Sequence, residues 1–294
     1  MPSHRIRGRH FWWGRLRGYL ALARISNSPT VLSNTLAGAA LTGVLAPNGT
    51  VVLLAVAMVF FYTAGMFLND LCDHAIDRHE RPERPLPSGL VSRSEAVAAV
   101  AGLFGAGAAV LFYAGTRPFL SGLALIAVIV VYDLWHKSNP LSPLLMAGAR
   151  VLVYVTTFLA FSMLPSGTLL ISGGLLMLYV VGLTYVAKTE NKPSATKYWP
   201  AAALFLPVVY FAFRLPPVAA MALLPLFAGW VAYSISFLYG PKSRDIGGAV
   251  GRLIAGISLY DGLVLVAAGS YIGAMLAVMT FLATLYLQRY VKGT

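Results

Sequence analysis

Apolar residues form long runs along this 294-residue chain, and short polar stretches separate them. A helix needs roughly 20 mainly apolar residues to cross a bilayer. Ten runs approach that length, although the seventh is short and only Gly269 and Ser270 separate the last two. The pattern predicts an all-α, polytopic transmembrane helical bundle over residues 28–294. Its expected spans are about 29–46, 51–69, 95–115, 118–135, 142–163, 167–187, 198–213, 217–239, 248–269 and 271–289.

Two kinds of polar segment alternate between these runs. Segments 70–93, 136–140, 188–197 and 240–252 are basic, as are both chain ends, whereas the intervening turns are short and carry at most one arginine each. Basic loops stay on the cytoplasmic side of a membrane. We therefore expect a multi-pass protein of the cell inner membrane, with its N-terminus and basic loops in the cytoplasm. Placing both chain ends on one side requires an even number of spans, which favours ten.

Composition supports a membrane protein. Hydrophobic residues make up 58% of the chain and charged residues 11%, whereas a soluble domain carries about 25% charged residues. The net charge of +12 fits basic cytoplasmic loops and anionic lipid headgroups, so we expect membrane lipid as a partner and no nucleic acid. Residues 1–27 are basic with aromatic residues interleaved, which predicts an interfacial amphipathic segment.

The most informative stretch is 69–89, NDLCDHAIDRHERPERPLPSG, at the end of the second run. Asn69, Asp73 and Asp77 are spaced at i, i+4 and i+8, so on a helix they form one stripe, with Asp70 beside them. Oxygen ligands of this kind suit Mg²⁺. Arg84, in the basic segment that follows, is placed to hold the other end of a diphosphate. The alternative is a solvated or salt-bridged loop, but grouped ionisable residues at a membrane usually mark a functional site.

This motif resembles the first aspartate-rich signature of the UbiA superfamily of intramembrane prenyltransferases, NDxxDxxxD followed by a basic turn and RPLPSG. The resemblance implies a UbiA-like bundle with nine core spans, to which a tenth is added here. It implies that Asn69, Asp73 and Asp77 bind Mg²⁺ bridging an isoprenyl diphosphate, with support from Asp70. It also implies that Arg24 and Asn34 line the acceptor cavity. For Asn34 an interhelical hydrogen bond is an equal alternative.

A second constellation follows the fourth run. Proteins of this superfamily usually place a tyrosine here and a Lys-Arg pair four and five residues later. In this chain the positions are Tyr132, His136 and Lys137, which implies contacts to substrate phosphates, although a histidine is cationic only when protonated. The alternative is a belt of interfacial side chains at headgroup depth.

The superfamily's second aspartate motif is altered. After the sixth run Tyr185 fits the pattern, but no aspartate follows, and Lys188, Glu190 and Asn191 stand there instead. We expect Lys188 to supply the missing positive charge, Asn191 to provide a neutral oxygen, and Glu190 to be the nearest general base. Otherwise catalysis has been lost or changed. Residues 135–154 and 184–191 look like the EboC-like branch, which shares the intact first motif and the altered second one.

The expected function is therefore Mg²⁺-dependent transfer of an isoprenyl group from a prenyl diphosphate to an aromatic or other small lipophilic acceptor within the membrane. Asp70, Asp73, Asp77 and Glu190 form its expected catalytic set. One alternative is a non-catalytic UbiA-like subunit that binds a prenyl lipid.

A secondary transporter is a further alternative. The intramembrane residues Arg150 and Asp261 would suit one, although no inverted repeat relates the two halves of the chain. For Asp261 we expect a structural pairing with Arg252.

Overall fold

The computed structural model describes residues 14–137, 139–188, 199–239 and 245–291, and these ranges are helical apart from turns and the loop 81–92. Residues 14–22 form a first short helix. The elements that follow are the 3-10 helix η1 (Ile25–Asn27) and the helices α2 (Pro29–Ala40), α3 (Gly49–Glu80), α4 (Arg93–Ala114), α5 (Thr116–Trp135), α6 (Ser142–Leu159), α7 (Gly167–Ala187), α8 (Trp199–Ala212), α9 (Pro217–Tyr239), α10 (Ile246–Ala267) and α11 (Tyr271–Gln288).

The ten expected apolar runs each coincide with one of the helices α2 to α11, which confirms the all-α polytopic bundle. Among the described residues, eight helices are long and apolar enough to cross a membrane, while α2 has 12 residues and α8 has 14. The exact number of spans therefore stays a prediction. The largest difference is in α3, whose 32 residues run beyond the expected end at 69 and include the whole acidic stripe.

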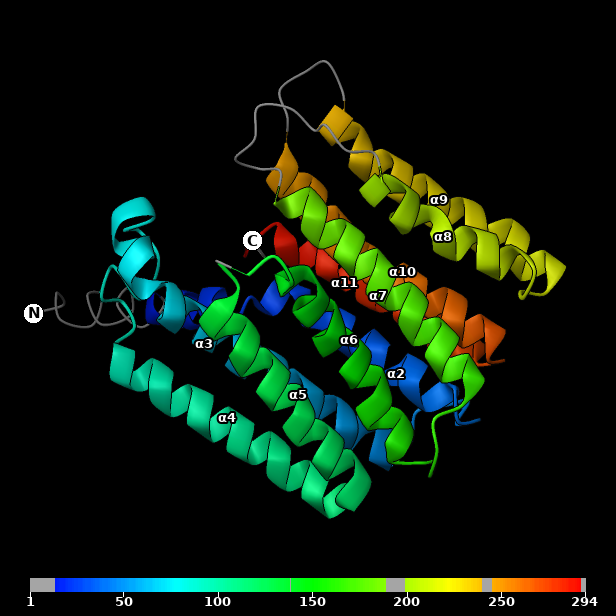
Figure 1. Ribbon diagram of the computed structural model, residues 1–294, viewed down its shortest axis with the longest axis horizontal. Helices are drawn as coiled ribbons and strands as arrows, with labels where there is room; N and C mark the ends of the chain where they lie inside the picture. The colour runs from blue at the N-terminus through cyan, green and yellow to red at the C-terminus, as the bar shows by residue number, and fades with distance from the viewer. Residues whose placement is uncertain (1–13, 138, 189–198, 240–244, 292–294) are drawn as a thin grey trace, which may run out of the picture.

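Local signals explain where several helices begin and end. The side chain of Asn48 accepts a hydrogen bond from the Val51 amide at the start of α3, and Ser92 forms a capping box with Glu95 at the start of α4. Gly115, with φ of 136°, makes the tight turn from α4 to α5. This turn lies at the opposite end of the bundle from the C-terminal ends of α3, α5 and α7, which lie together (Figure 1).

The helices differ strongly in burial. In the most apolar 18-residue stretch of α10, 83% of the residues are buried, whereas in α4 and in α9 the share is 17%. α10 packs against α2, α7, α9 and α11, whereas α4 and the α8–α9 pair lie on opposite sides of the bundle (Figure 1). The peripheral helices expose large apolar side chains, such as Tyr113 on α4 and Val218 on α9. Exposed apolar faces of this kind suit contact with lipid tails.

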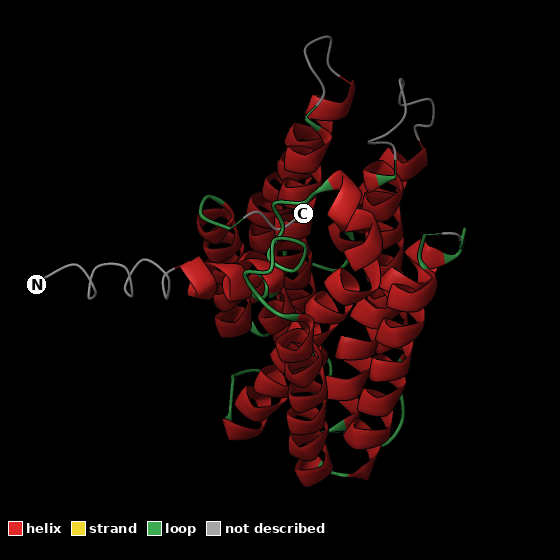
Figure 2. Ribbon diagram, turned by 90° about the vertical axis from the view of Figure 1, so that its left-hand side faces the viewer, coloured by secondary structure: helices red, strands yellow, loops and turns green. Residues whose placement is uncertain are grey.

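Two contacts near the N-terminus matter for the site. A Cβ atom on Gly38 of α2 would lie 2.8 Å from the Tyr154 carbonyl oxygen of α6, so glycine permits the close approach of these helices. The short helix 14–22 lies crosswise to the long helices (Figure 2). It is held by an Arg15–Glu95 ion pair and by Leu22, which is buried in a cluster with Phe67.

Candidate functional site

The acidic stripe lies on the last three turns of α3. Because α3 continues to Glu80, Asn69, Asp73 and Asp77 lie on successive turns of one helix, as the spacing predicts. Asn69, Asp70 and Asp77 are buried. Buried carboxyl groups need partners, because moving them out of water without a compensating charge or hydrogen bond is costly.

Arginines from two other segments provide partners. Arg84, in the loop after α3, lies 2.7 Å from Asp77 Oδ2 and 3.7 Å from Asp70 Oδ1. Arg24, just before η1, donates at 3.1 Å both to Asp70 Oδ1 and to Asn69 Oδ1. The fold therefore brings two arginines that are 60 positions apart in sequence onto one carboxyl group.

Asp73 is matched by the segment at the end of α5. Lys137 Nζ lies 2.8 Å from Asp73 Oδ1, and His136 Nε2 lies 3.8 Å from the same oxygen. The His136 ring stacks on Tyr132, with 5.1 Å between ring centroids. The two residues that replace the usual Lys-Arg pair thus reach the acidic stripe from a different helix.

Arg24 has an unusual backbone conformation. It has φ of 40° and ψ of 48°, in the left-handed region, which non-glycine residues seldom adopt. Tyr62 donates to the Arg24 carbonyl oxygen at 3.1 Å, and the Arg24 guanidinium also lies 3.3 Å from Met66 Sδ. Such strain persists where surrounding contacts fix it, and it is concentrated at functional sites.

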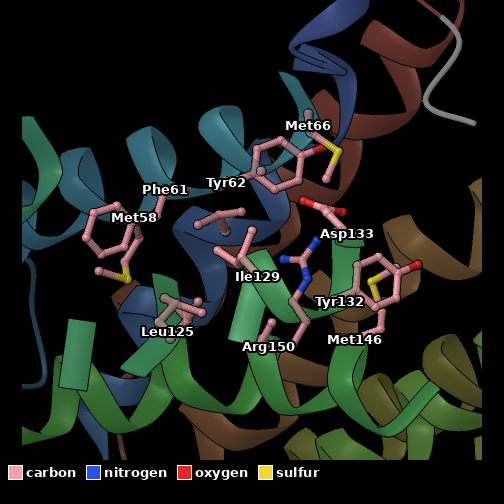
Figure 3. Close-up of a pocket in the computed structure, with 14 residues that line it drawn as sticks. Met58, Phe61, Tyr62, Met66, Leu125, Ile129, Tyr132, Asp133, Met146 and Arg150 are labelled. Atoms are coloured by element: carbon pink, nitrogen blue, oxygen red, sulfur yellow. The ribbon is translucent and has the colours of Figure 1, made fainter. Parts of the chain in front are cut away.

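A pocket opens beside the stripe, between α2, α3, α5 and α6. Most of its walls are apolar. Figure 3 shows its polar residues, Tyr62, Tyr132, Asp133 and Arg150, toward one side of the pocket, with Met58, Phe61 and Leu125 on the other. Asn69 joins the stripe to the pocket, because its Nδ2 donates to Asp133 Oδ1 at 3.1 Å. The apolar lining comprises Val31, Met58, Phe61, Gly65, Met66, Leu125, Ile129, Met146, Ala149 and Val153.

Behind the pocket lies a second polar cluster. Arg150 Nη1 donates to Asn34 Oδ1 at 3.0 Å, and Asn34 Nδ2 donates to Asp261 at 2.8 Å. Ser33 and Tyr154 also donate to Asp261, each at 2.5 Å. Asn34 thus makes interhelical hydrogen bonds, one of them to the pocket residue Arg150. Asn34 itself is not among the residues that line the pocket.

The expected pairing of Arg252 with Asp261 is wrong. The two residues are nine positions apart on α10, which is two and a half turns, so their side chains leave opposite faces of the helix. Arg252 instead lies 3.2 Å from Asp245 and 4.0 Å from the centre of the Phe237 ring.

The altered second motif is described only in part. Lys188 Nζ donates to Ser142 Oγ at 2.8 Å. Ser142 is the first residue of α6 and lies five positions after Lys137 in the sequence. Tyr185 packs edge-to-face against Trp199, with 4.7 Å between ring centroids. Glu190 and Asn191 lie outside the described residues.

Sequence reasoning did not assign Asp133 and Tyr62 to a site, and it considered Arg150 only as an intramembrane residue that would suit a transporter. An acidic residue inside an apolar run is a detectable signal, and Asp133 was visible in this way beside Tyr132. Its role depends on Asn69, 64 positions away, and no local pattern reveals that contact.

The site consists of a row of oxygen ligands on α3, basic side chains from other segments that contact this row, and an apolar pocket beside it. Within the described residues no three Asp, Glu, His or Cys side chains converge closely enough to hold a metal ion by themselves. The stripe does offer single carboxyl groups on successive turns. Mg²⁺ is commonly held by one or two carboxylates together with water and substrate phosphates, so this donor set fits Mg²⁺ bound with a phosphorylated substrate.

Comparison with known proteins agrees with this geometry. A family model described as UbiA prenyltransferase family matches residues 31–250. The digeranylgeranylglyceryl phosphate synthase of Methanoregula boonei is 41% identical over 132 residues, which cover 42% of this chain and 44% of the relative. The synthase of the same name from Methanothermobacter thermautotrophicus is 42% identical over 88 residues, covering 29% of this chain and 30% of that relative. These matches span less than half of the curated relatives.

Solved structures show the same fold. A structure of a digeranylgeranylglyceryl phosphate synthase superposes with a TM-score of 0.59 at 19% identity, covering 89% of this chain and 99% of that one. A UbiA homolog from Archaeoglobus fulgidus bound to DMAPP and Mg²⁺ superposes with a TM-score of 0.57 at 17% identity, covering 84% of this chain and 98% of that one. At these identities the likeness concerns the fold.

Proposed function

This chain belongs to the UbiA prenyltransferase family, and we propose that it transfers an isoprenyl group from a prenyl diphosphate to a lipophilic acceptor within the membrane, with Mg²⁺. The observation that carries the proposal is the stripe on α3, where Asp70, Asp73 and Asp77 each meet a cation from another segment. An array of both charges is what a metal-bound diphosphate requires.

Asn69, Asp73 and Asp77 are the proposed Mg²⁺ ligands, with Asp70 supporting them. Bound Mg²⁺ supplies positive charge against the charge that develops on a departing diphosphate. In the free protein the negative charges of these carboxyl groups are balanced by cations of the chain, because Arg84 pairs with Asp77 and Lys137 pairs with Asp73.

The cations of the site have a second task in this proposal. Arg24, Arg84 and Lys137 lie at the stripe and would contact phosphate oxygens of the donor, and Lys188 would add a further positive charge from the end of α7. Positive charges near a departing diphosphate stabilise the charge that develops on it. The bond from the prenyl carbon to the diphosphate oxygen breaks with its electron pair on the oxygen, which leaves an allylic cation.

The apolar pocket beside the stripe suits that cation and the acceptor that reacts with it. Its walls exclude water, which would otherwise capture the cation. Its volume is about 110 Å³, so we infer that a long prenyl chain extends from the stripe between helices toward the lipid. We infer that this site is on the cytoplasmic side, because Arg84 in the loop after α3 and Lys137 after α5, both in basic segments, lie at the stripe.

The relatives named digeranylgeranylglyceryl phosphate synthase suggest one acceptor to test. Geranylgeranylglyceryl phosphate has one geranylgeranyl group fewer than the compound in that name, so it is a suitable acceptor to test with this chain. An aromatic acceptor such as 4-hydroxybenzoate belongs in the same assay, with geranylgeranyl diphosphate as donor.

The decisive experiment measures binding of geranylgeranyl diphosphate to the purified full chain, with and without Mg²⁺, and product formation with both acceptors. Asp73→Ala is compared with Asp245→Ala, which removes a carboxyl group outside the site. We expect Mg²⁺-dependent binding and transfer to be lost in Asp73→Ala and kept in Asp245→Ala. Binding without transfer to any acceptor would favour the non-catalytic subunit. Binding that ignores both Mg²⁺ and Asp73 would refute the proposal.

A further inference from the structure

Asp133 lies where the pocket meets the acidic stripe, and among the described residues only one of its two carboxyl oxygens has a hydrogen-bond partner. Oδ1 accepts the hydrogen bond from Asn69 Nδ2 at 3.1 Å. Oδ2 is buried and has no hydrogen-bond partner among the residues that the structure describes. The residue is 4% exposed and lines the pocket (Figure 3).

A buried polar atom without a partner is costly, by about 1–3 kcal/mol. Tyr62, Tyr132 and Arg150 also line the pocket, but none of them makes a hydrogen bond to Oδ2, and most of the remaining lining is apolar. A molecule in the pocket that donates a hydrogen bond to this oxygen would remove that cost. The protein therefore favours a ligand with an apolar body and a donating group at one end.

Neighbouring contacts fix the position of this oxygen. Arg24 holds the Asn69 side chain through its Oδ1, so that Nδ2 is left to hold Asp133. On the other side, His136 Nδ1 lies 3.2 Å from the Asp133 carbonyl oxygen and His136 Nε2 lies 3.8 Å from Asp73. The hydrogen bond from Asn69 thus holds the Asp133 carboxyl group beside the residues to which we assign the diphosphate.

We propose that Asp133 Oδ2 accepts a hydrogen bond from the hydroxyl group of a lipophilic acceptor in this pocket, and so positions the acceptor's nucleophilic group beside the prenyl diphosphate. This inference rests on the proposed function and adds the residue that selects the acceptor. Acceptors that bear a hydroxyl group are favoured over those in which the hydroxyl hydrogen is replaced by a methyl group.

A pair of probes tests this selection without knowledge of the natural acceptor. Farnesol and farnesyl methyl ether differ only in the presence of a hydroxyl donor. Their dissociation constants are measured on the full chain in one detergent, and the ratio of the two constants is compared between variants, so that unequal partitioning into detergent cancels. For the wild type we expect a ratio in favour of farnesol about tenfold larger than for Asp133→Leu, which has no acceptor oxygen.

Asp133→Asn sharpens the test, because it preserves the shape of the side chain. Asn69 Nδ2 needs an acceptor, so the amide oxygen of the variant faces Asn69 and its NH₂ group faces the pocket. We expect the preference for farnesol to disappear here too, while Mg²⁺-dependent binding of geranylgeranyl diphosphate is retained. Asp245→Asn makes the same chemical change on an exposed residue and should keep the wild-type ratio.

Equal ratios in the wild type, Asp133→Asn and Asp133→Leu would overturn the assignment of Asp133. That outcome is separate from failure of the proposed function, which shows as loss of Mg²⁺-dependent diphosphate binding. The protein could also show a preference for the hydroxyl compound that depends on Asp133 but bind no diphosphate. That result would support the role of Asp133 and refute only the prenyltransferase proposal.

Discussion

Aspartates occupy two interior regions of this bundle, and their partners differ in kind. On α3, Asp70, Asp73 and Asp77 face the cationic side chains of other segments. On α10, Asp261 is fully buried and accepts hydrogen bonds from the neutral side chains of Ser33, Asn34 and Tyr154.

The difference separates a site that can exchange partners from one that cannot. A cation such as Lys137 is 42% exposed, so water can hydrate it when a metal ion or phosphate takes over its partner. The donors to Asp261 come from α2 and α6 and have no access to water. We infer that the α3 stripe is built to bind a ligand, and that the α10 cluster joins helices and holds Arg150 at the pocket wall. This assignment also weakens the transporter alternative, which relied on Arg150 and Asp261.

The largest expected effect separates the two regions by stability. Asp261→Ala leaves several buried donors without an acceptor, each costing about 1–3 kcal/mol, so we expect a loss of at least about 3 kcal/mol in the free energy of unfolding. Asp73→Ala makes the same change in a partly hydrated ion pair and should cost about 1 kcal/mol or less. Thermal unfolding in detergent compares the two. Similar losses for both variants would contradict the distinction.

A smaller effect tests whether the α10 cluster is stronger than an ordinary buried hydrogen bond. Tyr154→Phe removes a donor to the Asp261 carboxyl group, and Tyr179→Phe removes a donor to the Leu253 carbonyl oxygen at 2.8 Å. Both tyrosines are fully buried. We expect losses in unfolding free energy of about 1.7 kcal/mol for Tyr154→Phe and about 0.6 kcal/mol for Tyr179→Phe. The same unfolding assay measures both, and a larger loss for Tyr179→Phe would contradict the ranking.

The sequence predicts the α3 stripe well and the α10 cluster poorly, for a physical reason. The positions of Asn69, Asp73 and Asp77 relative to one another depend only on helical periodicity, which is local. The surroundings of Asp261 depend on how α2, α6 and α10 are rotated against one another, which no local pattern gives. The incorrect pairing with Arg252 is a different error, because the nine-residue spacing on one helix already places the two side chains on opposite faces. Asp133 is an intermediate case, since its location in an apolar run is visible but its contact with Asn69 is not.

A third prediction concerns the cation that contacts most of the stripe. Arg84 lies within ion-pair distance of Asp70 and Asp77, and we propose that it turns to the diphosphate when the donor binds. Arg84→Ala should therefore weaken Mg²⁺-dependent binding of geranylgeranyl diphosphate about tenfold, a loss typical of one charge-assisted contact. Arg84→Lys keeps the charge but loses the fork that reaches two oxygens, so it should recover part of the affinity. Unchanged affinity in Arg84→Ala would limit Arg84 to a structural role.

The smallest expected effect tests whether the altered second motif still belongs to the site. Lys188 is exposed and donates to Ser142 at the start of α6, so its contribution to diphosphate binding is screened by water. Lys188→Ala should weaken binding of geranylgeranyl diphosphate by about two- to threefold, with a larger loss at low ionic strength, and Lys188→Arg should restore it. Ser142→Ala is the matched control, because it removes the hydrogen bond but leaves the charge. If Ser142→Ala weakened binding as much as Lys188→Ala, the lysine would act by holding α6. The positive charge expected in place of the second aspartate motif would then have to come from another residue.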